Sequence, residues 1–326
     1  MSNKGLSIVG AGAWGSALAI ALRDNFSEIS LHTYTENEVS SLPPRHPALT
    51  VDYSENTELT FGLESIKKSE CVIIAVPSYG FSTTIEDIKP FLSSKHKIAW
   101  VTKGFDSPHQ CFLHESFDRT IKDHHSCVIS GPSFALEVAN DKPTALSVAS
   151  NDKETREYWA KVLRTKTLRA YTNDDVIGVE VGGTVKNILA IAAGISSGLG
   201  FGSNTQAALI TRGLAEMIRF GKSLGAKELT FNGLSGMGDL VLTCSDNLSR
   251  NRRFGVELAK NYTAKQAAEN VGATVEGLNT LELVLLIARK NKVEMPICEQ
   301  VYQVVQNNIT PKQAVIDLMS REQTGE

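Results

Sequence analysis

The stretch that decides the fold of the first half of the chain is "LSIVGAGAWGSALAI", residues 6–20. A short apolar run leads into Gly10, Gly12 and Gly15, which are spaced G-x-G-x-x-G, and a helix-like run of small and apolar residues follows. In this spacing the first glycine permits a tight turn, the second lets a ligand approach the backbone, and the third lets helix and strand pack closely. The N–H groups at the start of such a helix favour phosphate. The pattern therefore predicts a strand, a dinucleotide-binding turn and a helix, with a purely structural glycine turn as the alternative.

On both sides of this motif, β-rich runs alternate with helical ones throughout residues 1–177. Apolar runs without alternation favour strands that are buried on both faces of a parallel sheet. Strands separated by helices predict a doubly wound α/β fold, here a Rossmann domain. The expected helix covers 13–25, and the expected strands are 6–12, 29–34, 71–77, 97–104, 126–131 and 144–150.

From about residue 178 the pattern changes to helical spacing, and strand-like runs nearly disappear. Residues 178–326 are therefore predicted to form an all-helical C-terminal domain, joined to the first by a change of composition rather than a flexible linker. In "TQAALITRGLAEMIRFGKSLG" (205–225), Arg212 and Glu216 stand four apart. That spacing places both side chains on one polar side of a helix.

Composition excludes several kinds of partner. The formal net charge of the 326 residues is −3, from 33 basic and 36 acidic residues, which gives no support to nucleic acid as a partner. Five scattered cysteines without a C-x-x-C pair predict neither a disulfide framework nor zinc, and we expect no metal site. No secretory signal is recognisable, and we see no run of the about 20 apolar residues that a membrane span needs. We therefore expect a cytoplasmic protein without membrane insertion.

The cofactor that the glycine motif predicts is NADH or NADPH, and the second strand bears on the choice. An NAD site typically has an acid about 20 residues after the motif, against the ribose hydroxyl. Here the run "ISLHTY" is followed by Thr35, with Glu36 just beyond, so we expect no carboxylate at the strand tip. A 2′-phosphate is then repelled less, but no arginine stands at the tip to bind it. His32 and Arg45 are the nearest basic residues, each with an ordinary polar role as the alternative.

Lys186 is unusual because apolar and small residues follow it almost without interruption, "ILAIAAGISSGLG" (188–200). On a helix it shares one side with Ala190, Ala193 and Ser197, whose small size leaves room for a ligand or another backbone. Hydride transfer to or from a nicotinamide needs a group that moves a proton, and a buried lysine can serve as general acid or base. Burial lowers the pKa of a lysine and a neighbouring carboxylate raises it, and the sequence leaves the balance open. The alternative is a lysine that extends to solvent.

Three further stretches carry polar residues at the expected ends of strands or starts of helices. "VTKG" (101–104) places Lys103 after a strand, "SGPSFALEV" (130–138) contains a small-residue turn, and "GMGDLVLTCSDNLSRNRRFG" (236–255) is rich in donors. We assign Asp239 to orienting Lys186, with Thr243 in support and a helix cap as the alternative for Asp239. Arg250 and Asn251 suit phosphate oxygens. Arg252 and Arg253 are then surface or fold-supporting residues.

Taken in order, these motifs resemble the bacterial NAD(P)-dependent glycerol-3-phosphate dehydrogenases. The resemblance runs from "GAGAWG" (10–15) to "VEMPICEQVYQV" (293–304) and includes "ISGPSFA", "GGTVKN", "ALITRGLAEM", "GDLVLTC" and "SRNRRFG". It implies a Rossmann domain followed by a helical one, and a cytoplasmic enzyme that is commonly a homodimer. It also implies interconversion of dihydroxyacetone phosphate and sn-glycerol 3-phosphate for phospholipid synthesis.

The resemblance and the residue patterns together give three sets of candidate residues. The catalytic set is Lys186, Asp239 and Lys103. The substrate-binding set is Lys103, Gly131, Ser133, Lys186, Asn187, Asp239, Thr243, Ser249, Arg250 and Asn251. The cofactor-binding set is Gly10, Gly12, Ala13, Trp14, Gly15, Tyr34, Lys103, Ala135, Arg250, Thr274 and Glu276. Tyr34 departs from the histidine or arginine that relatives often carry there.

Two other functions fit parts of the pattern. A related Rossmann dehydrogenase that acts on a 3-hydroxyacid would use the same motifs, because Arg250 and Asn251 suit a carboxylate as well as a phosphate. A non-catalytic dinucleotide sensor would bind the cofactor without turnover. Such a sensor has no need of a lysine inside an apolar helix.

Overall fold

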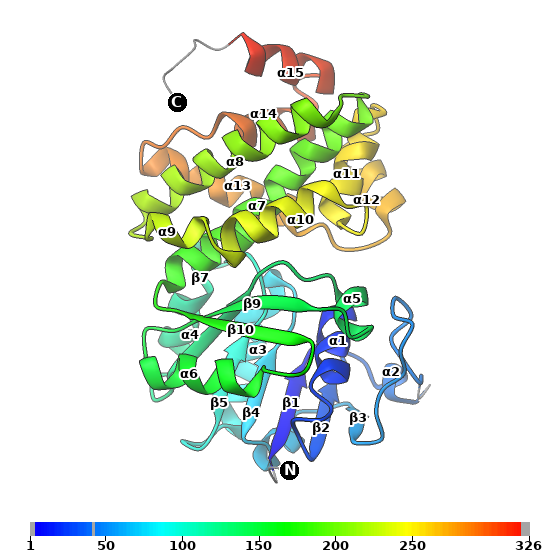
Figure 1. The fold of residues 1–326 in the computed structure, drawn as a ribbon, viewed down its shortest axis with the longest axis vertical. Helices are drawn as coiled ribbons and strands as arrows, with labels where there is room; N and C mark the ends of the chain where they lie inside the picture. Colours follow the sequence, from blue (N-terminus) through cyan, green and yellow to red (C-terminus); the bar gives the residue numbers. More distant parts are fainter. Residues whose placement is uncertain (1–3, 41–42, 321–326) are drawn as a thin grey trace. The chain divides into compact units, whose positions relative to one another are not determined.

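A computed structural model of the chain describes residues 4–40 and 43–320. Residue contacts divide the chain into two compact units, Met1–Glu180 and Val181–Glu326. Helix α7 (Val176–Gly198) begins in the first unit and continues in the second, so the chain passes between them within a helix (Figure 1). The sequence suggested a boundary between residues 177 and 178, which also lies within α7.

The first unit is built on a sheet. Within the described residues, eight strands form it in the order β10-β9-β8-β5-β4-β1-β2-β3. Every neighbouring pair is parallel except β8 and β9, which are antiparallel. The strands are β1 (Gly5–Val9), β2 (Glu28–His32), β3 (Thr57–Thr60), β4 (Cys71–Ile74), β5 (Lys97–Trp100), β8 (Ser126–Ser130), β9 (Thr144–Ala149) and β10 (Leu168–Asn173). A separate hairpin pairs β6 (Phe105–Asp106) with β7 (Cys111–Phe112).

All six predicted strands form, and the Rossmann fold is confirmed at the centre of the sheet. Two sheet strands were missed, β3 and β10, and both stand at the edges of the sheet. Their residues are mostly half-buried or exposed, so they lack the continuous apolar run that identified the central strands. The sheet is mixed rather than wholly parallel because β9 reverses direction against β8.

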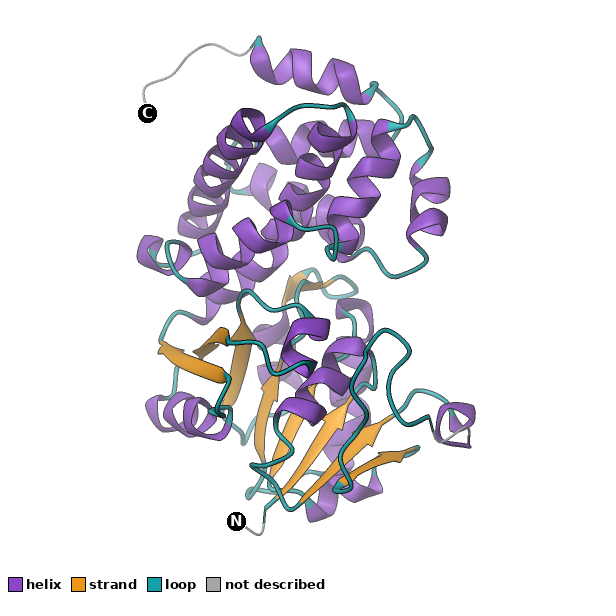
Figure 2. Ribbon diagram, turned by 45° about the vertical axis from the view of Figure 1, so that its right-hand side comes forward, coloured by secondary structure: helices purple, strands orange, loops and turns teal. Residues whose placement is uncertain are grey.

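Helices cover both faces of this sheet (Figure 2). Alternate residues of a strand point to opposite faces, so Ile73 packs in one core cluster and Ile74 in another. The first cluster includes Leu18 of α1 and Trp159 of α6, and the second includes Phe81 of α3. The helices of this unit are α1 (Ala13–Ala21), α2 (Glu36–Ser40), α3 (Phe81–Ile88), α4 (Leu113–Thr120), α5 (Ala135–Ala139) and α6 (Lys153–Val162).

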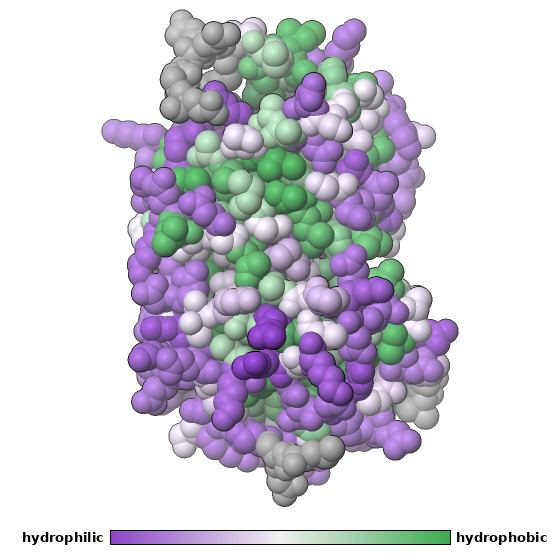
Figure 3. Space-filling view, viewed as in Figure 1, coloured by the Kyte–Doolittle hydropathy of each residue, from purple (hydrophilic) through white to green (hydrophobic). Residues whose placement is uncertain are grey.

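The second unit, where it is described, contains helices and no strand, as predicted (Figure 2). After α7 come α8 (Ser203–Ser223), α9 (Glu228–Phe231), α10 (Asp239–Ser245), α11 (Arg250–Ala259), α12 (Ala264–Val271), α13 (Glu276–Lys290), α14 (Pro296–Val305) and α15 (Pro311–Met319). Polar residues predominate on much of the surface in Figure 3, while hydrophobic ones gather over part of this unit. Its exposed large apolar side chains include Leu229 and Leu286.

Glycines bring α7 and α11 into backbone contact. A Cβ atom at Gly194 would lie 2.0 Å from the carbonyl oxygen of Arg252, and one at Gly255 would lie 2.1 Å from that of Ile191. Both distances are far below van der Waals contact, so only glycine fits. Gly194 of the lysine-bearing helix therefore admits the backbone of α11.

Helix α7 is also long and apolar enough to cross a membrane by length and composition, although we expected no such segment from the sequence. In the structure 94% of its most apolar window is buried. This is typical of the core helix of a globular unit.

The prediction that Arg212 and Glu216 share a polar side of the helix is wrong. Arg212 is exposed, but the side chain of Glu216 is 1% exposed. Its carboxylate accepts hydrogen bonds from the N–H groups of Ile297 at 2.6 Å and Cys298 at 3.3 Å, at the start of α14. Burial raises the pKa of Glu216 to about 7, against the effect of these two donors. A local i,i+4 rule could not reveal a partner that lies about 80 residues away in the sequence.

Candidate functional site

The glycine-rich loop has the geometry that a dinucleotide pyrophosphate needs. Gly10 has φ of +117°, and a Cβ there would lie 2.7 Å from the carbonyl oxygen of Ala75. A Cβ at Gly15 would lie 2.0 Å from the oxygen of Gly10. Gly12 is different, because a Cβ there would meet nothing within 4 Å. Gly12 is also the N-cap of α1 without a side-chain cap, so the first N–H groups of this helix suit a phosphate.

The tip of β2 differs from the sequence-based expectation. Tyr34 is 92% exposed, and we expected no carboxylate beside it. In the structure Oε2 of Glu38 accepts hydrogen bonds from the N–H groups of Tyr34 at 3.0 Å and Thr35 at 3.1 Å. A carboxylate therefore does lie at the strand tip. The signal was present as "TENE" (35–38), because a threonine followed three residues later by glutamate is typical of a helix start that bonds back in this way.

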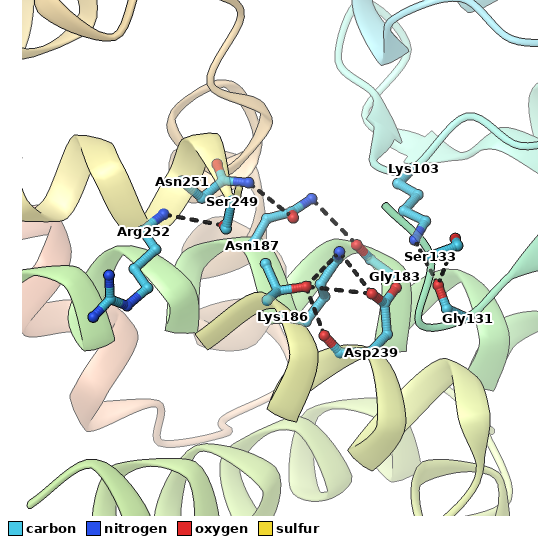
Figure 4. Close-up of polar contacts among 11 residues, drawn as sticks. Lys103, Gly131, Ser133, Gly183, Lys186, Asn187, Asp239, Ser249, Asn251 and Arg252 are labelled. Atoms are coloured by element: carbon cyan, nitrogen blue, oxygen red, sulfur yellow. Dashed lines mark hydrogen bonds and ion pairs between the residues drawn. The ribbon is translucent and has the colours of Figure 1, made fainter. Parts of the chain in front are cut away.

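Lys103 and the turn after β8 lie together in the first unit. Nζ of Lys103 donates to the carbonyl oxygen of Gly131 at 3.4 Å, and the hydroxyl of Ser133 donates to the same oxygen at 3.1 Å (Figure 4). Strands β5 and β8 are parallel neighbours, so the segments that follow them leave the sheet at the same edge. Gly131 has φ of +140°, which explains why glycine stands at this turn.

Lys186 and Asp239 lie together in the second unit (Figure 4), and Thr243 forms a buried cluster with them. Nζ of Lys186 donates to Oδ1 of Asp239 at 2.9 Å and to Oγ1 of Thr243 at 2.8 Å. The side chain of Lys186 is 9% exposed and that of Asp239 is 2% exposed. The lysine therefore does not extend to bulk solvent. A carboxylate this close stabilises the ammonium form, while burial opposes it.

Local backbone geometry brings the aspartate to the lysine. A single π-helical turn, Leu234–Gly238, runs directly into α10, and Asp239 is the first residue of that helix rather than its cap. A Cβ at Gly182 would lie 2.3 Å from the carbonyl oxygen of Ser235, so this turn packs directly on α7. Thr243 stands one turn after Asp239 and donates to its carbonyl oxygen at 2.6 Å. The threonine hydroxyl is thereby oriented to accept from the lysine.

Cys244, which follows Thr243, is fully buried, and burial raises its pKa to about 12. A thiol with so high a pKa is not a nucleophile near neutral pH. Cys244 is therefore a core residue.

Asn187 and Asn251 form a second polar group beside the lysine on α7 (Figure 4). Nδ2 of Asn251 donates to Oδ1 of Asn187 at 2.9 Å, and Nδ2 of Asn187 donates to the carbonyl oxygen of Gly183 at 3.3 Å. Oδ1 of Asn251 accepts from the N–H of Gly277 at 2.9 Å. A primary amide carries two N–H donors, and each contact with an oxygen uses one of them. These contacts hold both amides in fixed orientations.

The segment of residues 249–253 divides its roles among neighbouring side chains. The hydroxyl of Ser249 accepts from the N–H of Arg252 and caps α11, which Arg250 begins as an exposed residue. The side chain of Arg252 donates to the carbonyl oxygen of Cys244 at 3.0 Å, to Ser197 at 2.9 Å and to Asn247. Arg252 is therefore a fold-supporting residue, as expected. Arg253 is exposed.

The remaining cofactor candidates stand at the starts of helices. Ala13 and Trp14 open α1, and the half-buried indole of Trp14 packs against core residues of the first unit. Ala135 opens α5 in the same unit. In the second unit Thr274 is half-buried and Glu276 begins α13, one residue before the glycine that contacts Asn251.

Comparison with known proteins covers both units. Residues 5–156 match the family model described as NAD-dependent glycerol-3-phosphate dehydrogenase N-terminus, and residues 175–316 match the corresponding C-terminus. Proteins named glycerol-3-phosphate dehydrogenase (NAD(P)+) are similar along the whole chain. The one from Ruthia magnifica is 64% identical over 99% of this chain and 100% of its own length, and the one from Idiomarina loihiensis is 42% identical over the whole of both.

A solved structure agrees with these matches. The crystal structure of glycerol-3-phosphate dehydrogenase from Coxiella burnetii superposes with a TM-score of 0.92 and 41% sequence identity, covering 98% of this chain and 99% of that one. The resemblance seen in the sequence motifs is confirmed by matches that span both units. The chain belongs to the NAD-dependent glycerol-3-phosphate dehydrogenase family.

Proposed function

We propose that this chain catalyses reversible hydride transfer between NADH or NADPH and dihydroxyacetone phosphate, giving sn-glycerol 3-phosphate for glycerophospholipid synthesis. The observation that carries the proposal is the buried Lys186, which donates to Asp239 at 2.9 Å in a chain that belongs to this family. A buried ammonium held by a carboxylate suits a proton-transfer reaction better than a structural role. An uncharged core of similar volume is commonly as stable as a buried ion pair.

The first unit would hold the cofactor. The N–H groups at the start of α1 and the open backbone at Gly12 suit the pyrophosphate, and the exposed ring of Tyr34 offers a stacking surface. When bound, the nicotinamide supplies or accepts the hydride. Lys103, Gly131 and Ser133 present polar groups at the same carboxyl edge of the sheet, where this class of fold binds ligands.

In ketone reduction, Lys186 would donate a proton to the carbonyl oxygen of the substrate and stabilise the alkoxide charge that develops there. Asp239 stabilises the ammonium form of the lysine, and Thr243 fixes the direction of one N–H bond through its own hydrogen bond to the helix backbone. In the reverse direction the neutral amine accepts the alcohol proton. Asp239 then orients Nζ of Lys186 through the same hydrogen bond.

The phosphate of the substrate would be bound by groups near the start of α11. Arg250 is exposed, and a guanidinium presents a planar set of donors that suits phosphate oxygens. The fixed amides of Asn187 and Asn251 each have a second N–H to offer. Binding energy from a distant phosphate can be used to position the carbonyl carbon.

The experiment is a spectrophotometric assay of purified protein with dihydroxyacetone phosphate and with an unphosphorylated 3-ketoacid, each with NADH and with NADPH. Oxidation of the cofactor with the phosphorylated ketone alone supports the proposal. Turnover of the 3-ketoacid instead would favour the hydroxyacid dehydrogenase. Cofactor binding without turnover of either substrate would favour the sensor.

We also propose that the enzyme is a cytoplasmic homodimer without membrane insertion, as the family resemblance suggests. The five cysteines are free thiols, which suits a reducing compartment, and the apolar residues of α7 are buried. Light scattering of the purified protein measures the dimer directly. A monomer at micromolar concentration would contradict this part of the proposal.

A further inference from the structure

Glu38 is a charged residue at the tip of β2 to which the proposed mechanism gives no role. Strand β2 ends at His32, and α2 begins at Glu36. Within that short helix the side chain of Glu38 folds back, and its Oε2 accepts from the N–H groups of Tyr34 at 3.0 Å and Thr35 at 3.1 Å. The residue is exposed, so a ligand can reach its carboxylate.

This carboxylate follows the strand next to the glycine-rich loop. Strands β1 and β2 are parallel with Val9 opposite His32, and the N–H of Gly10 donates to the carbonyl oxygen of His32 at 3.1 Å. The chain after His32 therefore leaves the sheet beside the glycine turn. In Rossmann units the residue at this position contacts the ribose next to the adenine, where NAD carries a 2′-hydroxyl and NADP a 2′-phosphate.

We propose that Glu38 binds this ribose and makes the enzyme prefer NADH to NADPH, an inference that rests on the proposed use of a nicotinamide cofactor. Ribose hydroxyls are hydrogen-bond donors, and an ionised carboxylate at the tip of the strand is an acceptor for them. The same charge repels a 2′-phosphate. The N–H groups of Tyr34 and Thr35, which would otherwise suit that phosphate, already donate to Glu38.

The basic residues near this tip are poorly suited to a 2′-phosphate. The imidazole of His32 is 2% exposed and contacts the carbonyl oxygen of Gly62 at 2.6 Å, and burial lowers its pKa. Arg45 forms an ion pair with Asp52 at 2.7 Å. His46 lies close enough for Glu38 to favour its charged form, but burial has the larger effect and lowers the pKa of His46. At neutral pH the histidines are therefore mainly uncharged.

The test compares NADH and NADPH in the wild-type enzyme and in Glu38→Gln, by kcat/KM with dihydroxyacetone phosphate and by direct cofactor binding in a fluorescence titration. We expect the wild type to favour NADH by about tenfold or more, and Glu38→Gln to reduce this ratio by about tenfold. The change should lie in the cofactor KM and Kd, with kcat little altered. A wild type that binds NADPH as tightly as NADH, or a variant with an unchanged ratio, would overturn the proposal.

Glu36→Gln is the matched control, because Glu36 is also exposed and stands in the first turn of the same helix. If loss of any negative charge near the tip were sufficient, the two variants would shift the ratio equally, and the specific role of Glu38 would be wrong. Circular dichroism checks that both variants fold. The binding titration needs no substrate, so a shifted binding ratio without turnover would contradict the proposed function and leave the role of Glu38 intact.

Discussion

The glycine-rich loop of the first unit and the Lys186 cluster of the second differ in what forms them. In the loop, glycines stand where a strand, a helix and a ligand must approach one another closely. The hydrogen-bond donors available to the ligand there are backbone N–H groups. In the cluster, the side chain of Lys186 meets those of Asp239 and Thr243, which lie 53 and 57 residues after it in the sequence. The ion pair and the hydrogen bonds among these three buried side chains stabilise the charges. A site of the first kind is local in sequence, whereas a site of the second kind exists only when helices pack.

This contrast predicts different consequences of mutation, and the largest is expected at Lys186. Replacing Lys186 with alanine removes the proposed proton donor, so kcat with dihydroxyacetone phosphate should fall by about 10² to 10⁴-fold. Cofactor affinity, measured by fluorescence titration, should stay within a few-fold because the glycine-rich loop is unchanged. Near-normal turnover would remove Lys186 from the mechanism.

The same substitution leaves Asp239 buried without its lysine, which costs about 3–5 kcal/mol of stability in known buried pairs. Asp239→Asn is the companion variant, because it keeps the shape of the side chain and removes its charge. It should lower kcat and shift the pH profile of activity, while thermal unfolding reports the fold of each variant. If activity were lost only in variants that had also unfolded, a role of Asp239 in proton transfer would be contradicted.

Two substitutions in the glycine-rich loop separate packing from ligand binding. Gly15→Ala places a Cβ 2.0 Å from a backbone oxygen, so we expect a loss of about 1–3 kcal/mol in stability. Gly12→Ala meets nothing within 4 Å and should cost about 1 kcal/mol or less, yet raise the cofactor Kd by about tenfold. Thermal melts and cofactor titrations of both variants check this difference. Equal losses of stability in the two variants would show that Gly15 is not specifically a packing position and Gly12 not specifically a ligand-binding one.

Glu216 extends the comparison to a buried ionisable group outside the Lys186 cluster. Its pKa is raised from 4.5 to about 7 by burial, so the folded state favours the neutral acid. The stabilisation from this group is therefore full below about pH 4.5 and is lost as the pH rises through 7, a change of about 3 kcal/mol. The glutamine of the Glu216→Gln variant does not titrate, so the unfolding free energy of this variant should fall less between pH 5 and 8 than that of the wild type. Glu282→Gln, an exposed change in the same unit, should keep the wild-type pH dependence.

The smallest effect is expected at Arg250, which is exposed and contributes to binding rather than to proton transfer. Arg250→Ala should raise the KM for dihydroxyacetone phosphate by about tenfold with little change in melting temperature. Its neighbour Arg253 is also exposed, and Arg253→Ala should leave the KM unchanged. Equal changes in the two variants would indicate a general electrostatic effect instead of a specific phosphate contact.

The failures of sequence reasoning have both local and distant causes. Glu38 was overlooked at the strand tip because its carboxylate reaches the tip only when the chain turns into a helix and folds back. Glu216 was assigned to the polar side of its helix because spacing within one helix says nothing about a second helix that covers it. Strands β3 and β10 were missed because an edge strand needs no continuous apolar run.

The sequence by itself determined the central strands, the glycine-rich turn and the helical second unit, because each depends on residues that are neighbours along the chain. It also identified Lys186 as anomalous, since a charge among apolar residues is visible without a structure. Only the tertiary structure decided that this charge is buried and paired with Asp239, and that α11 packs on α7 through glycine. The physical reason is that desolvation and ion pairing depend on which distant segments fill the surrounding space, and a linear pattern does not contain that information.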